Sequence, residues 1–219
     1  MDIFRTHEDI LRDYHEFIAS FVHIKDEQIR RQVEQELSSG ALWPEPLIQF
    51  NPAFEIDGSV HDVVQRLHLQ PGLAAAFRDF TLYKHQVRAL ELGSRSQDFI
   101  VTSGTGSGKS LTYISAILND LLARGCPSGI QAVIVYPMNA LINSQSEALR
   151  GFAANYEQAL GVPFPVHFEQ YTGQEKKPAR DRVRESPPQI LLTNYMMLEL
   201  ILTRIAEQGI RSSIFADLR

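Results

Sequence analysis

Residues 103–110 form a glycine-rich loop of the kind that binds phosphate groups. They read Ser-Gly-Thr-Gly-Ser-Gly-Lys-Ser and follow the apolar residues Phe99-Ile100-Val101. In such a loop, backbone N–H groups surround phosphate oxygens, and the positive end of the next helix points at the same place. Lys109 is placed to reach β- and γ-phosphates, and Ser110 to ligate Mg²⁺. The loop therefore predicts a site for a nucleoside triphosphate and its magnesium ion.

The loop departs from the general phosphate-loop pattern at its first position, where Ser103 replaces a glycine. The alternative interpretation is a flexible Gly/Ser linker. Linkers are not normally enclosed between an apolar, β-branched run and an amphipathic helix that begins with Lys-Ser. This context favours phosphate binding.

The composition indicates a globular protein without a disulfide framework. The chain has 219 residues, 44% of them hydrophobic, which is enough for one full domain core. Cys126 is the single cysteine, so internal disulfides and a four-cysteine zinc site are excluded. No apolar run approaches the roughly 20 residues that cross a bilayer, and the first residues do not resemble a signal peptide. We therefore expect a soluble, cytoplasmic protein without a membrane partner.

The net charge of −5 is unevenly distributed. Residues 1–60 contain 5 Lys and Arg against 12 Asp and Glu, whereas residues 61–219 contain 16 against 14. This balance does not indicate general affinity for nucleic acid, so any such contact must come from local groups.

The first 80 residues have a helical pattern. Apolar residues at helical spacing predict a helix over 7–23, and a second helix should run from near Asp26 to Gly40. Trp43-Pro44-Glu45-Pro46 predicts an extended passage, and short helical pieces follow around 63–67 and 73–77. The aromatic stripe of the first helix fits core or inter-domain packing better than a groove for a partner, although both are possible.

Helices and apolar strands alternate from residue 82 onward. We predict strands at 98–102, 131–136, 165–171 and 189–193, and helices at 82–94, 109–124, 139–156, 175–185 and 195–206. Repeated βα units form a parallel sheet that is covered on both faces. The predicted organisation is a helical extension over 1–80 followed by an α/β phosphate-loop domain over 81–219.

Several stretches, in the right order, resemble superfamily 2 DEAD/DEAH-box ATP-dependent helicases of the bacterial type. Gln86 resembles the adenine-reading glutamine of that family, and Ser103 to Ser110 resemble motif I, which normally begins with a small residue. Val133 to Leu141 resemble motif Ia, Tyr171 to Gln174 motif Ib, and Ile190 to Asn194 motif Ic. The acidic first part of the chain with Trp43 to Pro46 is also similar to the lead-in of large bacterial members. The resemblance implies a first RecA-like domain, incomplete in this chain.

The resemblance implies two sets of binding residues. The ATP-binding set, with Ser110 also binding Mg²⁺, is Gln86, Thr105, Gly106, Ser107, Gly108, Lys109 and Ser110. The nucleic-acid-binding set would contact the backbone of DNA or RNA, and backbone contacts imply sequence-independent binding. Its members are Pro137, Asn139, Thr172, Gly173, Thr193 and Asn194. Each of these motifs follows a predicted strand, at the edge of an open α/β sheet where ligands bind. The threonine and asparagine side chains could equally serve as helix N-caps, and the two roles are compatible.

Glu175 to Glu185 contain five Lys or Arg residues among three acidic ones. Such a mixed run is more often a solvated helix face than a phosphate-binding patch.

The acidic pair that would hold Mg²⁺ and position the attacking water is missing from the sequence. The nearest candidate is Ser213 to Asp217, but Leu218 follows where a glutamate is needed. We therefore assign no catalytic residue. The strand that carries motif III in these helicases is missing as well, so we expect the Phe99 to Thr102 strand to lack one neighbour.

The sequence thus predicts the ATP-binding and nucleic-acid-binding N-terminal part of a DNA or RNA helicase that does not hydrolyse ATP alone. The alternative is a non-catalytic nucleotide-binding subunit of a split helicase, or an interaction module. In that case a separate chain would supply the missing C-terminal helicase domains.

Overall fold

The computed structural model describes residues 2–40, 47 and 53–217. Contacts divide the chain into two compact units, residues 1–52 and 53–219. The passage predicted at Trp43 to Pro46 lies outside the described residues. None of the described helices is both long and apolar enough to cross a membrane. The boundary predicted between residues 80 and 81 stays a prediction.

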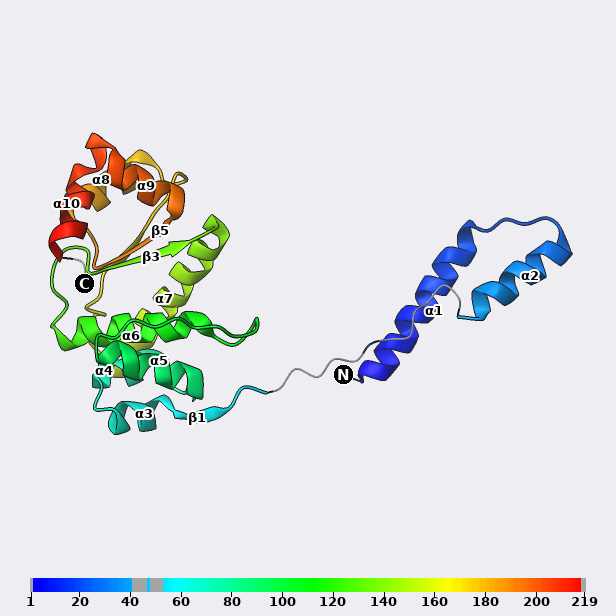
Figure 1. The fold of residues 1–219 in the computed structure, drawn as a ribbon, viewed down its shortest axis with the longest axis horizontal. Coiled ribbons are helices and arrows are strands. Elements are labelled where there is room, and N and C mark those ends of the chain that lie inside the picture. Colours follow the sequence, from blue (N-terminus) through cyan, green and yellow to red (C-terminus); the bar gives the residue numbers. More distant parts are fainter. Residues whose placement is uncertain (1, 41–46, 48–52, 218–219) are drawn as a thin grey trace. The chain divides into compact units, whose positions relative to one another are not determined.

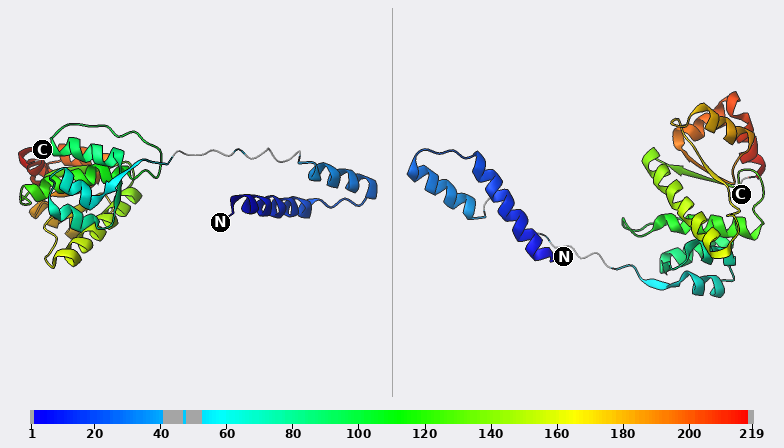
Figure 2. Two further views of the ribbon diagram at one scale, coloured as in Figure 1. Left: turned by 90° about the horizontal axis from the view of Figure 1, so that it is seen from below. Right: turned by 180° about the vertical axis from the view of Figure 1, so that it is seen from behind.

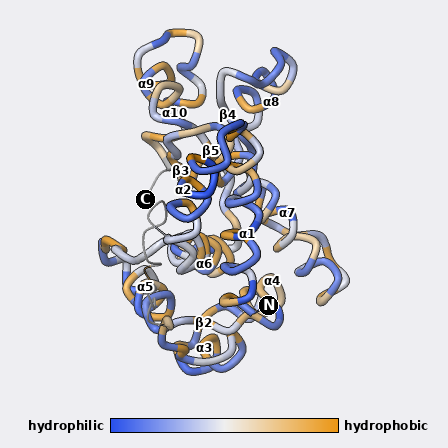
Figure 3. The backbone as a smooth tube through the Cα atoms, turned by 90° about the vertical axis from the view of Figure 1, so that its right-hand side faces the viewer, coloured by the Kyte–Doolittle hydropathy of each residue, from blue (hydrophilic) through white to orange (hydrophobic). Residues whose placement is uncertain are grey.

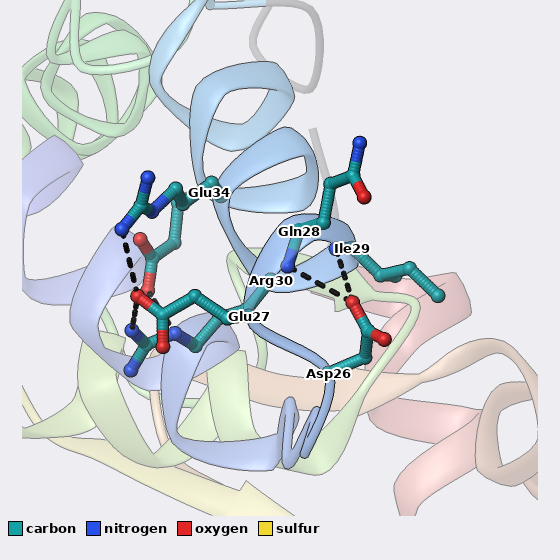
Figure 4. A network of polar contacts seen from close by, with 7 residues as sticks. Asp26, Glu27, Gln28, Ile29, Arg30 and Glu34 are labelled. Atoms are coloured by element: carbon teal, nitrogen blue, oxygen red, sulfur yellow. Dashed lines mark hydrogen bonds and ion pairs between the residues drawn. The ribbon is translucent and has the colours of Figure 1, made fainter.

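The N-terminal unit contains the two predicted helices, α1 (Ile3–Phe21) and α2 (Glu27–Ser38). Helix α1 begins four residues earlier than predicted because the Asp2 carboxylate accepts the Phe4 N–H at 3.0 Å and so caps the helix. Asp26 caps α2 by accepting the N–H groups of Gln28 and Ile29 (Figure 4). The aromatic stripe of α1 is exposed in this unit, with Phe21 at 69%.

The larger unit contains all the described strands and eight α-helices. In chain order it has β1 (Ile56–Ser59), α3 (Val60–Arg66), α4 (Pro71–Phe77), β2 (Thr81–Tyr83), α5 (Lys84–Ser94), α6 (Lys109–Ala123), β3 (Ala132–Tyr136), α7 (Asn139–Leu160), β4 (Phe168–Tyr171), α8 (Lys177–Glu185), β5 (Ile190–Asn194), α9 (Tyr195–Thr203), the 3₁₀ turn η1 (Ile205–Glu207) and α10 (Gln208–Asp217) (Figure 1). The alternation predicted from residue 82 is largely confirmed.

The predicted parallel sheet is present, with strand order β3-β5-β4. The hydrophobic residues of β3 and β5 are visible along the backbone (Figure 3). Tyr136 pairs with Asn194, and Tyr171 pairs with Thr193. Because the strands are parallel, their carboxyl ends meet at one edge of the sheet.

Helices cover both faces of this sheet (Figures 1 and 2). Ile190 and Leu192 of β5 pack in a core formed with α3 to α7, whereas Leu191 packs with residues of α8 to α10. Adjacent residues of a strand point to opposite faces, so a continuous apolar strand is needed to fill both cores.

Three features differ from the predictions. Residues 97–103 form no strand, and Ile100 is 93% exposed. An extended segment needs a hydrogen-bonded neighbour to become a strand, and none lies beside it among the described residues. Strand β1 pairs antiparallel with β2, which the sequence pattern did not show because strands of four and three residues have little periodicity. Finally, Ser213 to Asp217 lie in helix α10, so the candidate acidic strand is helical.

Candidate nucleotide loop and strand-end interface

The glycine-rich loop ends at helix α6 in a conformation that requires glycine. Gly106 and Gly108 have φ of +76° and +68°, in the left-handed region. Gly108 is the N-cap of α6 and offers no side chain to the first-turn N–H groups. Those donors are therefore free of a side-chain cap, and the dipole of a 15-residue helix adds positive potential at the loop.

The first turn of α5 holds the loop in place. His85 Nε2 lies 2.9 Å from the carbonyl oxygen of Ser107, and Gln86 Nε2 donates to the carbonyl oxygen of Gly108 at 3.1 Å. Gln86 Oε1 accepts the backbone N–H of Tyr83 at 2.8 Å. Both polar atoms of Gln86 thus have protein partners, and the side chain is only 4% exposed. His85 was not among the predicted site residues, although its position beside Gln86 was a usable signal.

Gly108 is the position in the loop that is most sensitive to substitution. A Cβ there would lie 2.5 Å from Gln86 Nε2, in addition to the cost of a left-handed backbone. We expect Gly108→Ala to lower the free energy of unfolding by about 1–2 kcal/mol and to weaken nucleotide binding at least tenfold. Urea denaturation and titration with a fluorescent ATP analogue measure the two effects.

The matched control is Gly104→Ala in the same loop, because a Cβ at Gly104 would meet nothing within 4 Å. This control should unfold at the same urea concentration as the natural chain. Equal unfolding midpoints for the two variants would show that the Gly108 geometry does not constrain the loop.

Lys109 and Ser110 lie at the start of α6 beside an open cavity. Lys109 Nζ donates to the carbonyl oxygens of Ser103 and Gly104 at 2.9 and 2.6 Å, so the ammonium group lies over the loop. Ser103 Oγ and Ser107 Oγ, 2.5 Å apart, brace the base of the loop. The cavity, of ≈ 540 Å³, is lined by Phe99, Val101, Lys109, Ser110, Thr112 and Tyr113. Thr105 and Gly106 are exposed at the tip of the loop.

At the carboxyl ends of β4 and β5, two predicted threonines are engaged inside the protein. Thr193 is fully buried, and its hydroxyl donates to the carbonyl oxygen of Tyr171 at 2.6 Å, which joins β5 to β4. Thr172 is 2% exposed, and its hydroxyl and N–H both bond the carboxylate of Glu175. Neither threonine caps a helix. Gly173, next in the chain, is exposed.

Asn139 and Asn194 form a direct link between two helix N-termini. Asn194 Nδ2 donates to Asn139 Oδ1 at 2.8 Å, across 55 positions of the chain. Asn194 Oδ1 accepts the N–H of Met197 at 2.8 Å, so the capping role considered for Asn194 is confirmed. The link holds the starts of α7 and α9 together at the sheet edge. Pro137, at the end of β3, is exposed beside it.

A buried polar cluster fixes the end of β4. Tyr171 donates its hydroxyl to Glu207 Oε2 at 2.5 Å, and the Arg184 guanidinium donates to both carboxylate oxygens, at 3.0 and 2.6 Å. Burial, together with the hydrogen bond to Glu207, raises the pKa of Tyr171 to about 12. The Arg184 hydrogen bonds hold the pKa of Glu207 below its usual range. Arg184, whose side chain is 27% exposed, therefore faces this cluster and does not belong to the fully solvated helix face predicted for 175–185.

One hydrogen bond connects the loop helix with the strand-end edge. The hydroxyls of Tyr113 in α6 and Tyr136 in β3 lie 2.8 Å apart. Burial, reinforced by this bond, raises the pKa of Tyr136, so its hydroxyl stays protonated. The bond therefore links α6 to the end of β3, in addition to the apolar core that the two elements share.

Comparison with known proteins places the chain in one family. The profile of DEAD/DEAH box helicases matches residues 83–216, which include the loop and all three strands of the sheet. The Druantia protein DruE of Escherichia coli (strain UMEA 4076-1) is 29% identical over 200 residues. That alignment covers 80% of this chain and 11% of DruE, so the chain spans about a tenth of that relative.

Solved helicases share the fold. The helicase MrfA bound to DNA and AMPPNP superimposes with a TM-score of 0.60 at 20% identity, over 84% of this chain and 24% of MrfA. The helicase Lhr of Mycobacterium smegmatis, bound to ssDNA and AMP-PNP, gives 0.60 at 23% identity, over 72% and 20%. The larger unit thus contains part of a RecA-like α/β domain, and the chain belongs to the DEAD/DEAH box helicase family.

Proposed function

We propose that this chain is the ATP-binding and nucleic-acid-binding portion of an ATP-dependent DNA or RNA helicase that works in the cytoplasm. The observation that carries the proposal is the loop at 103–110, where left-handed glycines, an uncapped helix start and Lys109 converge. Backbone donors together with one lysine are the groups that bind a triphosphate.

In this proposal, the backbone N–H groups of Thr105 to Ser110 donate hydrogen bonds to the phosphate oxygens. Lys109 exchanges its hydrogen bonds to two loop carbonyls for bonds to phosphate oxygens. Ser110 borders the cavity next to Lys109, which suits a hydroxyl ligand of Mg²⁺, and the ion would neutralise phosphate charge. Gln86 contacts adenine only by exchanging one of its present partners, Tyr83 or Gly108.

The nucleic-acid backbone would lie along the carboxyl ends of β3, β5 and β4. Helix α7 begins at Asn139, and its N-cap residue Met138 makes no side-chain cap, so the first N–H groups can donate to phosphate oxygens. Pro137 and Gly173 border this edge, while Asn139 and Asn194 hold it in shape. Thr172 and Thr193 support the edge through their internal hydrogen bonds. Contacts of this kind read no base identity, so binding is independent of sequence.

Hydrolysis would need carboxylates beyond those of this site. In the described part of the chain, no three His, Cys, Asp or Glu residues are grouped so that they could hold a metal ion. We propose that other helicase segments supply the acidic pair and the second domain.

The proposal predicts that nucleotide and strand binding are coupled. A fluorescent ATP analogue should bind several-fold more tightly when a 20-nucleotide single strand is saturating, because both ligands act on elements joined by Tyr113 and Tyr136. By linkage, the strand must bind more tightly by the same factor in the presence of nucleotide.

The Tyr113→Phe variant removes only the hydroxyl and should reduce this factor without abolishing either binding. Running the titration with DNA and with RNA identifies the preferred strand. No binding of the analogue under any condition would disprove the proposed function.

A further inference from the structure

Four large apolar side chains are exposed where the proposed nucleic-acid edge lies. Their exposed fractions are 58% for Met138, 42% for Leu141, 62% for Tyr195 and 52% for Met196. We call these four residues the strand-end patch. Exposed apolar residues that gather in one place mark an interaction surface.

The fold brings the two halves of the patch together. Met138 precedes Asn139, and Tyr195 follows Asn194, so each adjoins one member of the hydrogen-bonded asparagine pair. The backbone register agrees, since Tyr136 of β3 pairs with Asn194 of β5. Met138 and Leu141 thus flank the start of α7, and Tyr195 and Met196 occupy the first turn of α9.

The electrostatic setting of the patch suits an anionic ligand. Neither α7 nor α9 has an acidic residue in its first turn, where Asp and Glu are otherwise favoured. Two positive helix ends therefore point to the same edge without a carboxylate to neutralise them. A ligand for this surface should carry negative groups and flat apolar groups at close spacing.

A single-stranded nucleic acid has this combination of groups. We propose that nucleobases of a single strand stack on Tyr195 and on the thioethers of Met138 and Met196, while the phosphates bind the helix ends. The inference rests on the proposed function and adds the bases to it. Aromatic rings and thioethers contact any base face without reading its edge, so sequence independence is kept. Paired bases in a duplex are not available for stacking, so the patch selects single strands.

The test compares two strands that differ only in their bases. A fluorescein-labelled 15-nucleotide oligothymidylate and a 15-nucleotide abasic strand are titrated with the full chain, and fluorescence anisotropy is measured. Base stacking on one aromatic ring and its neighbours should make the oligothymidylate bind about tenfold more tightly. The double variant Tyr195→Ser/Met196→Ser should bind both strands with the affinity of the abasic strand.

The matched control is Ile205→Ser/Phe215→Ser, which removes two apolar side chains that are 84% and 75% exposed in η1 and α10. This control should retain the tenfold preference. Met138→Ala tests the α7 side of the patch and should reduce the preference in part. Met138→Ala also keeps the inference testable if the double variant fails to fold.

Equal binding of both strands by the natural chain would overturn the inference and leave nucleic-acid binding intact. Absence of binding to either strand would overturn the inference together with the proposed nucleic-acid interface. If the double variant keeps the base preference but loses self-association in sedimentation, the patch is a protein contact and the inference is also overturned.

Discussion

The Lys109→Ala variant should bind a fluorescent ATP analogue about 100-fold more weakly than the natural chain. A hydrogen bond to a charged group contributes about 1.5–3 kcal/mol, and about 2.7 kcal/mol corresponds to a factor of 100. In the structure the ammonium group bonds only two carbonyl oxygens of the loop. In the variant, water can replace the ammonium group as the donor to the Gly104 carbonyl oxygen, because Gly104 is exposed. The free energy of unfolding should therefore change by less than about 0.5 kcal/mol.

Lys25→Ala is the matched control, since Lys25 is an exposed lysine between α1 and α2 in the other unit. It should leave nucleotide affinity unchanged. If Lys109→Ala binds the analogue as well as the natural chain does, the loop is not the nucleotide site. A steady-state ATPase activity that disappears in this variant would instead contradict the proposal that the chain alone does not hydrolyse ATP.

The Glu207→Ala variant should lose about 3 kcal/mol of unfolding free energy, the usual cost of removing one partner from a buried ion pair. Glu207 has a side chain only 5% exposed, so its loss leaves the Tyr171 hydroxyl without its acceptor and Arg184 with Asp181 as its remaining partner. Urea denaturation at pH 7 measures the change. Glu185→Ala, which removes an exposed carboxylate of α8, should alter stability by less than about 0.5 kcal/mol.

The same pair predicts how stability depends on pH. Since the pKa of Glu207 is lowered in the folded state, its ionised form stabilises the fold above the unfolded-state pKa of about 4.3. That stabilisation is lost as the pH falls through the folded-state pKa. The difference between the natural chain and Glu207→Gln should therefore be largest near neutral pH and shrink below about pH 4. A constant difference from pH 7 to pH 3 would show that the Glu207 charge does not act in the fold.

Much of the fold could be predicted from local sequence patterns. The parallel strands β3 and β5 were recognisable as short apolar runs, and the helices between them as periodic segments. Because parallel strands align their ends, the placement of Asn139 and Asn194 at one edge of the sheet followed from strand assignment, but their direct hydrogen bond did not. The phosphate loop was readable because its glycine spacing reflects a backbone conformation that few other residues adopt.

The hydrogen-bond partners of the site residues could not be predicted in this way. Gln86 has a donor and an acceptor suited to adenine, yet the acceptor is bonded to the Tyr83 N–H and the donor to the Gly108 carbonyl oxygen. Thr193 looked available for a phosphate, but its hydroxyl is buried against β4. A side chain takes whichever partner the folded chain brings nearest, and that partner can be far away in sequence.

The family, the phosphate loop and the order of helices and strands follow from local sequence patterns, because each depends on residue types at short spacing. Three features depend on the folded arrangement: residues 97–103 form no strand, Arg184 pairs with Glu207, and α5 holds the loop. These outcomes depend on long-range neighbours. A strand needs a paired neighbour and a buried charge needs an opposite charge, and both are supplied by the packing of distant segments.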